Sequence, residues 1–325
     1  MIGEKQTVKV TAPLPKSLEE LSGRELEKKM CVGGITTQAL RSLTDEFTNG
    51  GFEWLLPVVL SKTTDPLWPD PGASIEKRVE VEIYGERVNA MLSMIVHKIV
   101  VCSLAYPKMF ALSPNIRIER RERSVTGVHA YEFTQLDFEA RETTSDEIRS
   151  FVEKAVCGLI DDLKRERKDE LVNLERYDAL KTPDRPFKVY DREELEGKYG
   201  EEWEVKVQDL GGPLWVVNLP REFYDFEDFE TGKWDNFDLM LPGFGEVLSG
   251  SKREFQYDKL VKKMERDGIR KENYDVLLKM AKETTLKSTV GAGIGLERLM
   301  SWIVGADHIG EVQPFPKVPG VVYDL

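Results

Sequence analysis

An alternating run of glycines near the end of the chain constrains its fold more than any other feature. Residues 291–298 read Gly-Ala-Gly-Ile-Gly-Leu-Glu-Arg. The residues before the run are rich in β-formers and the apolar residues after it recur at helical spacing, which predicts a strand leading directly into a helix, with Arg298 at the junction. Glycines at such a place let a ligand or another backbone approach closely. The run is therefore either part of a phosphate site or a turn that packs a strand tightly against a helix.

Charge and cysteine usage narrow the class of protein. The 325 residues include 46 Lys+Arg and 58 Asp+Glu, a net charge of −12, which argues against a protein that coats nucleic acid through its phosphates. Cys31, Cys102 and Cys157 are far apart and lie beside apolar residues, as reduced core thiols do. No segment is apolar enough for a membrane span or a signal peptide. We expect a soluble cytoplasmic protein.

The pattern along the chain predicts an α+β fold in a single domain, residues 1–325, whose first 50 residues form a helical segment. We expect helices at residues 17–49, 92–102, 145–168 and 257–283, and strands at 52–60, 79–83, 115–119 and 132–139. A mostly antiparallel set of strands is expected between residues 186 and 254. Pro57 interrupts the first strand, which therefore belongs at an edge or an interface, and the proline-rich residues 64–72 are expected to form a loop.

Two further groups of residues carry chemical functions. Arg117 and Glu119 are two positions apart, and Gln135, Asp137 and Glu139 alternate with apolar residues, so a hairpin with one polar face is expected. That face either lines a ligand site, where buried polar groups need hydrogen-bond partners, or faces solvent.

Asp238 and Glu246 flank a Pro-Gly turn, where two carboxylates can converge on Mg²⁺ with phosphate oxygens completing its shell. Arg253, which follows on the same segment, presents a planar fork suited to a carboxylate. The alternative for all three residues is ordinary surface charge.

These segments, in this order, resemble the signature motifs of class II aminoacyl-tRNA synthetases, particularly their aspartyl and asparaginyl branch. Residues 52–57 resemble motif 1, residues 117–133 motif 2 and residues 291–298 motif 3, and residues 245–253 and 314–320 match phrases of that branch. The resemblance covers residues 40 to 320. It implies an antiparallel sheet flanked by helices, ATP bound over that sheet, and a homodimer formed through the motif 1 region.

Members of that branch carry an N-terminal β-barrel that reads the tRNA anticodon, whereas here about 50 helical residues precede Phe52. We therefore expect no anticodon-binding domain and no anticodon binding. The resemblance then points to the archaeal asparagine synthetases, a family of shortened relatives of asparaginyl-tRNA synthetase. The stretches that carry it are residues 64–71, 112–117, 131–139, 220–225 and 312–316.

That family makes asparagine, AMP and pyrophosphate from aspartate, ATP and ammonia through β-aspartyl-AMP. The resemblance implies ATP binding by Arg117, Glu119, His129, Phe133 and Arg298, and Mg²⁺ binding by Asp238 and Glu246. It implies aspartate binding by Ser93, Lys98, Gln135, Asp137, Ser249 and Arg253. Arg117 and Arg298 would be catalytic, and Asp225 would serve the incoming ammonia.

Lys98 bears most directly on the choice of substrate. It resembles the lysine that holds a carboxylate in aspartate-using members, and its apolar neighbours argue against a surface lysine. Three departures from the family pattern are Val128, where an arginine is frequent, Ser288-Thr289, where Pro-His is frequent, and Met91-Leu92, where polar residues are common.

Other classes of function stay open. One is an aspartate-adenylating ligase, or an aspartyl- or asparaginyl-tRNA synthetase paralogue, that uses a different amine acceptor. Another is a regulatory paralogue that binds ATP or an amino acid without catalysis, although the retained Arg117, Glu246, Arg253 and Arg298 argue against it.

Overall fold

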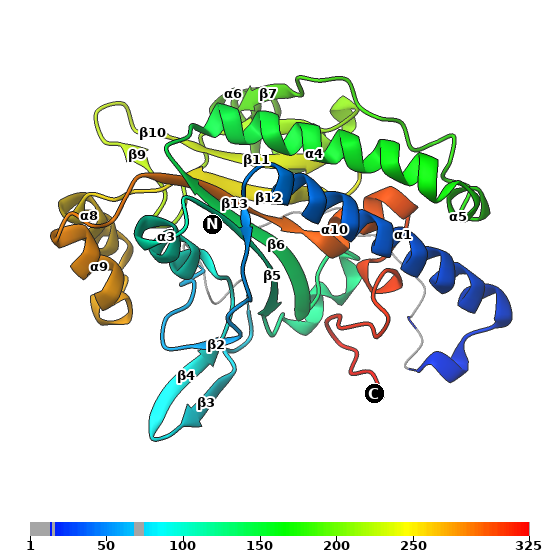
Figure 1. Cartoon of the computed structure of the whole chain (residues 1–325), viewed down its shortest axis with the longest axis horizontal. Coiled ribbons are helices and arrows are strands. Elements are labelled where there is room, and N and C mark those ends of the chain that lie inside the picture. The colour runs from blue at the N-terminus through cyan, green and yellow to red at the C-terminus, as the bar shows by residue number, and fades with distance from the viewer. Residues whose placement is uncertain (1–13, 15–16, 68–74, 325) are drawn as a thin grey trace.

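An eight-stranded sheet forms the centre of the computed structural model, which describes residues 14, 17–67 and 75–324 (Figure 1). In spatial order its strands are β1 (Glu53–Trp54), β5 (Lys108–Ile116), β6 (Glu132–Arg141), β13 (Thr289–Gly295), β12 (Gly245–Lys252), β11 (Asn236–Leu241), β8 (Leu214–Val217) and β7 (Lys188–Asp191). Neighbours are antiparallel except for the outermost pairs, β1–β5 and β7–β8, which are parallel. The predicted α+β class, with an antiparallel sheet flanked by helices, is confirmed.

Two long helices, α1 (Gly23–Asn49) and α4 (Ser145–Glu166), lie side by side over one face of the sheet (Figure 1). Each begins with a capping box, Ser22 with Glu25 and Thr144 with Glu147, in which side chains pair with the free backbone N–H groups of the first turn.

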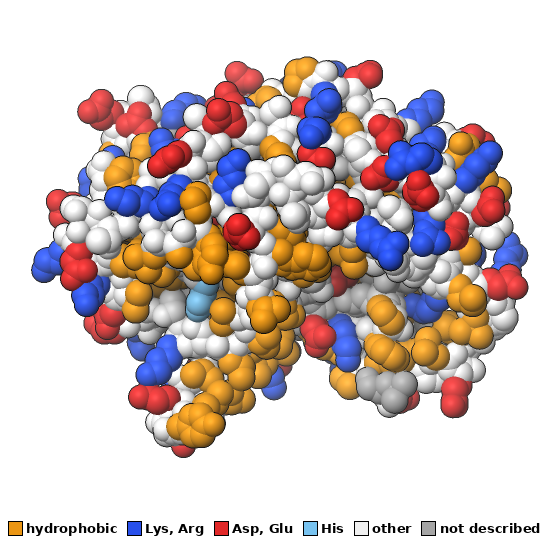
Figure 2. All heavy atoms as spheres, in the orientation of Figure 1, with side chains coloured by type: hydrophobic (Ala, Val, Ile, Leu, Met, Phe, Trp, Pro, Cys, Tyr) orange, Lys and Arg blue, Asp and Glu red, His pale blue; other side chains and the backbone are white. Residues whose placement is uncertain are grey.

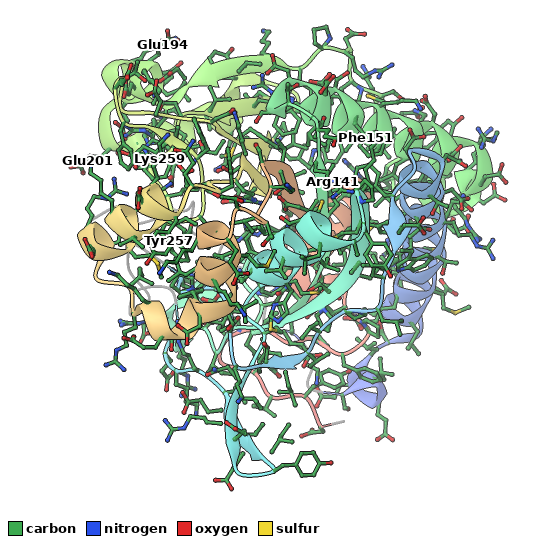
Figure 3. The ribbon with its side chains drawn as sticks, turned by 60° about the vertical axis from the view of Figure 1, so that its left-hand side comes forward. Arg141, Phe151, Glu194, Glu201, Tyr257 and Lys259 are labelled. Carbon is green, nitrogen blue, oxygen red and sulfur yellow. The ribbon has the colours of Figure 1, made fainter. Side chains whose placement is uncertain are left out.

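The rings of Phe47, Phe138 and Phe151 pack together beneath these helices (Phe151 is labelled in Figure 3). Short helices α5 (Lys168–Asn173) and α10 (Leu296–Val304) extend this layer, and Leu299 and Ile303 of α10 belong to the same core. This face of the sheet is therefore filled by apolar side chains, which leaves the other face for polar ones.

The opposite face is partly covered by α3 (Ile95–Leu104), which contacts β5, β6 and β13. Helices α8 (Tyr257–Asp267) and α9 (Asp275–Lys282) join α3 around a second apolar core that includes Ile99, Phe223 and Leu260. In Figure 3, Tyr257 and Lys259 mark α8.

Smaller elements lie outside the main sheet. A three-stranded sheet of β2 (Leu60–Ser61), β4 (Glu86–Ala90) and β3 (Glu80–Ile83) ends in a hairpin that projects as an arm (Figure 1), and β9 (Glu227–Asp228) pairs with β10 (Lys233–Trp234). In the parts of the chain that the structure describes, no helix combines the length and the apolar character needed to cross a membrane. The three cysteines are free, and Cys102 and Cys157 are buried.

Several expected boundaries were wrong. Instead of one strand at residues 52–60, the short strands β1 and β2 lie on either side of Pro57, which cannot donate a ladder hydrogen bond; β1 does lie at the sheet edge. The strand expected at residues 115–119 is β5, which ends at Ile116, so Arg117 and Glu119 follow the strand. Pro114 is tolerated within β5 because β1 pairs only with Met109 and Phe110, which leaves that edge open at Pro114.

The region expected to hold only strands, residues 186–254, contains a helical insertion. It comprises α6 (Arg192–Tyr199), α7 (Trp203–Lys206) and two 3₁₀ segments, Gly200–Glu202 and Val207–Leu210. Leu195, Trp203 and Val207 are buried together against β8. The expected helices are all present, although α3 begins at Ile95 rather than at residue 92. Residues 68–72 of the expected proline-rich loop lie outside the described residues, and residues 64–67 are irregular as expected.

Candidate active site

The glycine run lies in β13 and leads into α10, so the predicted strand-to-helix junction is confirmed. Gly291 is opposite Glu139 of β6, Gly293 is opposite Asp137, and Gly295 is opposite Gln135. A Cβ atom on Gly291 would lie 2.0 Å from Glu139 Oε2, and one on Gly293 would lie 3.0 Å from the Gln135 Nε2 atom. The glycines therefore clear the polar face of the sheet for the side chains of β6.

A cavity of about 150 Å³ opens where β6, β12 and the start of α10 meet the loop between β5 and β6. It is lined by all five residues expected to bind ATP, namely Arg117, Glu119, His129, Phe133 and Arg298. Gln135 and Glu246 line it as well. Residues that lie far apart in the sequence thus meet around one space.

Arg117 and Phe133 form one wall of this cavity. The Arg117 guanidinium lies 5.2 Å from the centre of the Phe133 ring, and its Nε donates to Leu92 O at 3.0 Å, which holds the guanidinium in place. His129 is buried, with its Nδ1 atom 2.6 Å from Thr126 Oγ1. An aromatic ring beside positive side chains suits a nucleotide base with its phosphates.

Arg298 also lines the cavity and connects three segments. Its Nε donates to Val128 O at 3.1 Å and its Nη1 donates to Glu246 O at 2.6 Å, so the β5–β6 loop and β12 are both tied to α10. The Val128 side chain is packed in the core. Val128, a departure from the expected family pattern, thus contributes a carbonyl that positions Arg298.

Glu297, the neighbour of Arg298, also lines the cavity but was missed by the sequence analysis. Its carboxylate accepts hydrogen bonds from Thr134 N at 2.9 and 3.0 Å. Burial raises the pKa of Glu297 to about 7, while these hydrogen bonds oppose the rise. Its adjacency to Arg298 at a helix start was the only signal available.

A buried lysine lies beyond the cavity on the same face of β6. Lys98, 1% exposed, donates from α3 to Asp137 Oδ1 at 2.8 Å and to Ala292 O at 2.8 Å. Asp137 Oδ2 is buried and has no hydrogen-bond partner in the described part of the chain. A lysine is seldom buried this completely without a role beyond packing, because its charge loses its hydration.

Arg253 is the second buried cation. Its Nε donates to Glu139 Oε1 at 3.2 Å, its Nη1 to Asp225 Oδ1 at 2.6 Å and its Nη2 to Gly291 O at 2.9 Å. Burial alone would lower the pKa of Arg253, but Glu139 and Asp225 raise it above its ordinary value. Together with Lys98 and Asp137, the network contains two cations and three carboxylates. Glu139 was quoted in the sequence analysis without a role, although it shares a strand face with Asp137.

The two predicted metal ligands share one face of the hairpin between β11 and β12. Asp238 is opposite Ser249, and a β-bulge after Leu239 places Glu246 opposite Met240. Since Asp238 and Met240 are two positions apart, the bulge brings Glu246 to the face of Asp238.

Asp238 is buried and its Oδ1 atom has no hydrogen-bond partner among the described residues. Burial raises the pKa of Asp238 to about 8, and nearby Arg221 opposes this rise. No group of three or more His, Cys, Asp or Glu side chains in the described residues could hold a metal ion. Two carboxylates, one with an unpaired buried oxygen, nevertheless fit Mg²⁺ that takes its remaining ligands from phosphates and water.

The predicted site residues therefore fall into two groups. Around the cavity are Arg117, Glu119, His129, Phe133, Gln135, Glu246 and Arg298. Away from its lining are Ser93, Lys98, Asp137, Asp225, Asp238, Ser249 and Arg253. Ser93 accepts a hydrogen bond from Ile95 N at 3.3 Å, just before α3 begins.

The fold is that of a class II synthetase catalytic core. A model of the family of class II tRNA synthetases (D, K and N) matches residues 78–319. Because this match spans most of the chain, the chain belongs to that family.

Relatives within the family include asparagine–tRNA ligases. The one from Thermococcus kodakarensis is 32% identical over 238 residues, which cover 66% of this chain and 54% of that protein, and the one from Mycoplasma mobile is 29% identical over 249 residues. This chain thus spans about half the length of these relatives.

Solved structures give the same fold. Asparaginyl-tRNA synthetase from Pyrococcus horikoshii, complexed with asparaginyl-adenylate, superposes with a TM-score of 0.79 at 22% identity, over 96% of this chain and 76% of that one. Aspartyl-tRNA synthetase from Entamoeba histolytica gives a TM-score of 0.71 at 19% identity, over 91% of this chain and 60% of that one.

Proposed function

We propose that this protein is an AMP-forming asparagine synthetase that activates aspartate with ATP and transfers the acyl group to ammonia. The observation that carries the proposal is the pair of buried cations, Lys98 and Arg253, beside the cavity. Gln135 lines the cavity, and Asp137 and Glu139, which hold the two cations, are the next positions on the same face of β6. An amino acid bound along this face would have its reacting end at the nucleotide.

The charges of this region suit aspartate. Aspartate has two carboxylates, and the one that does not react needs a cation in a place without water. Lys98 and Arg253 supply two, each held by a protein carboxylate that a substrate carboxylate can replace. Because the network has three carboxylates and only two cations, one negative charge is left to pair with the α-ammonium group of the substrate.

In the first step, an oxygen of the aspartate β-carboxylate attacks the α-phosphorus of ATP. The bond from this phosphorus to the bridging oxygen breaks, giving β-aspartyl-AMP and pyrophosphate. Arg117 and Arg298 would stabilise the negative charge on the phosphate oxygens, which is the largest contribution expected for phosphoryl and nucleotidyl transfer. Mg²⁺ held by Asp238 and Glu246 would neutralise phosphate charge.

In the second step, ammonium loses a proton to water, the resulting ammonia attacks the β-carbonyl carbon, AMP leaves with the bonding electrons, and the nitrogen loses a second proton to water to give the amide. Asp225 would attract ammonium toward the reacting carbon. Asp225 also has a structural role, because its Oδ1 atom accepts a hydrogen bond from Arg253 Nη1 at 2.6 Å. No covalent intermediate with the protein is required.

Adenylation of asparagine is the second candidate, because the relatives are asparagine–tRNA ligases. In that case Lys98 would remain paired with Asp137, and the side chain bound near it would be an amide. The acceptor would then be a ribose hydroxyl of a tRNA, or an amine.

We expect the purified protein with ATP, Mg²⁺ and aspartate to catalyse pyrophosphate exchange, and to release asparagine and AMP when ammonium is added. Products are measured by chromatography, with aspartate, asparagine and no amino acid as parallel reactions. Exchange that depends on asparagine instead of aspartate would support the second candidate and reject the first. Formation of ADP would reject both.

We also propose that the protein is a homodimer joined through the segment after α1. Large apolar side chains are exposed there on the motif 1 segment and neighbouring elements: Trp54, Leu56, Val59, Leu60, Leu104 and Tyr106. Figure 2 shows hydrophobic side chains gathered in this region and along the β3–β4 arm. Exposed apolar surface of this extent is typical of interfaces.

Replacing Leu56, which is 91% exposed, with aspartate should convert a dimer into monomers because a carboxylate would be buried in the interface. Sedimentation velocity measures the change. Val172→Asp is the matched control, since Val172 is an exposed residue of α5 on the far side of the molecule from the arm (Figure 1). A wild-type protein that sediments as a monomer at micromolar concentration would contradict the proposal.

A further inference from the structure

Arg221 contacts both of the paired strands that carry the proposed metal ligands. It lies in the segment before β9, and its guanidinium donates to both Asp238 of β11 and Ser249 of β12. Asp238 and Ser249 are direct partners in the sheet, so the arginine bridges adjacent positions on one face. The sequence analysis quoted Arg221 within residues 220–225 but gave it no role.

The electrostatic surroundings of Arg221 are strongly negative. Burial alone would lower the pKa of Arg221, but Asp238, Glu246 and Glu222 raise it well above its ordinary value. A guanidinium stays protonated in proteins, so Arg221 carries a positive charge in direct contact with Asp238. Arg221 donates a hydrogen bond to the Oδ2 atom of Asp238. The Oδ1 atom of Asp238 has no hydrogen-bond partner in the described part of the chain.

A divalent cation and a guanidinium compete for this carboxylate. Both are positive, the site is largely removed from water, and their mutual repulsion is strong at such separations. The phosphates of ATP change this balance, because they complete the shell of the metal ion and offer the guanidinium a new anionic partner.

We propose that Arg221 keeps Asp238 from holding a divalent cation until the nucleotide is bound. The protein would then take up the metal ion together with ATP rather than before it. This inference rests on the metal site of the proposed function, but it concerns binding and requires no turnover.

The test titrates Mn²⁺ into the protein without substrates and follows free Mn²⁺ by electron paramagnetic resonance. We expect Arg221→Gln to bind Mn²⁺ at least about tenfold more tightly than the wild type, because a competing charge is gone. Arg221→Lys, which keeps the charge, should bind as weakly as the wild type. With the ATP analogue α,β-methylene-ATP present, the advantage of Arg221→Gln should shrink to less than about threefold, because the phosphates draw Arg221 away from Asp238 in the wild type.

Arg192→Gln is the matched control. Arg192 is another partly buried arginine, donating to Asn218 O at 3.2 Å and pairing with Glu196 at 2.6 Å, away from Asp238 and Glu246. It should leave Mn²⁺ binding unchanged. Equal Mn²⁺ affinity of Arg221→Gln and the wild type would overturn the inference.

Asp238→Asn separates this inference from the metal site itself. If it leaves Mn²⁺ binding in the presence of the analogue intact, the proposed metal site is wrong. If it abolishes that binding while Arg221→Gln behaves as the wild type, only the role of Arg221 is wrong.

A second measurement is made on the wild-type protein itself and uses a variant only to assign signals. In the wild type, the guanidinium NMR signals of Arg221, assigned through Arg221→Lys, should be unaffected by Mg²⁺ alone and should shift when the analogue is added with Mg²⁺. A shift with Mg²⁺ alone would contradict the proposal even if Arg221→Gln failed to fold.

Discussion

Replacing Arg298 with alanine should lower the rate of aspartate-dependent pyrophosphate exchange by at least about a thousandfold, because a cation is lost where phosphate charge develops in the transition state. The same change removes hydrogen bonds to Val128 O and Glu246 O, so two walls of the cavity lose their connection to α10. The proposed dimer should stay intact, since Arg298 lies in the cavity and not on the exposed motif 1 segment. Exchange kinetics and sedimentation velocity measure the two outcomes.

The structure provides a close control for this change. Arg176 also donates to two backbone carbonyls, Ile303 O at 2.9 Å and Trp302 O at 3.0 Å, both at the other end of α10 and away from the cavity. Arg176→Ala should cost a comparable amount of stability, about 1–3 kcal/mol, and leave exchange nearly unchanged. Wild-type exchange in Arg298→Ala would remove Arg298 from the proposed mechanism, and an equal loss in both variants would assign the effect to destabilisation of α10.

The parts of the fold that were predicted from the sequence have strong local patterns. The glycine run and the apolar spacing after it identified β13 and α10, and the alternation at residues 132–139 identified β6. Where local rules conflicted with the fold, the prediction failed. Most of β5 was not predicted because it contains Pro114. A proline fits within this strand only because no neighbouring strand pairs with that edge at Pro114, and this is a property of the tertiary structure.

The candidate site shows the same division. Five residues expected to bind ATP meet around one cavity, since each belongs to a recognisable segment. The convergence of Asp238 and Glu246 depends on a β-bulge after Leu239, and bulges leave little trace in a single sequence. The position of Arg221 between Asp238 and Ser249 depends on how a long connection folds back over the sheet, which no local pattern specifies.

The glycine run itself has a different physical role from the one first considered. The initial alternatives were a phosphate site and a tight packing turn. In the structure, Gly291 and Gly293 are paired strand residues whose missing side chains make room for Glu139, Gln135 and Asp137. Within the run, Arg298 is the cation that lines the cavity, so the glycines shape the proposed amino-acid side of the site and the arginine shapes the proposed nucleotide side.

Replacing Gly291 with alanine should destabilise the protein by more than about 3 kcal/mol, at the upper end of what overpacking costs. The new Cβ atom would lie 2.0 Å from Glu139 Oε2 and 2.3 Å from Phe138 O. The Glu139 side chain holds Arg253, and Phe138 O belongs to the backbone of the neighbouring strand, so neither can move without breaking the network or the sheet. Urea unfolding followed by circular dichroism measures the loss.

Two other glycines serve as controls that separate the effect of steric crowding from the effect of replacing a glycine as such. The three atoms nearest to a Cβ atom on Gly293 would be side-chain atoms, at 3.0 to 3.2 Å, so Gly293→Ala should cost about 1 kcal/mol while raising the KM for aspartate, whose proposed place it narrows. Gly158 in α4 has no atom within 4 Å of an added Cβ, and Gly158→Ala should stabilise the protein by about 0.5–1 kcal/mol. If all three variants lost the same amount of stability, a lack of space for side chains could not explain the glycines of β13. If Gly293→Ala lost stability but kept its affinity for aspartate, the amino acid would bind elsewhere than along β6.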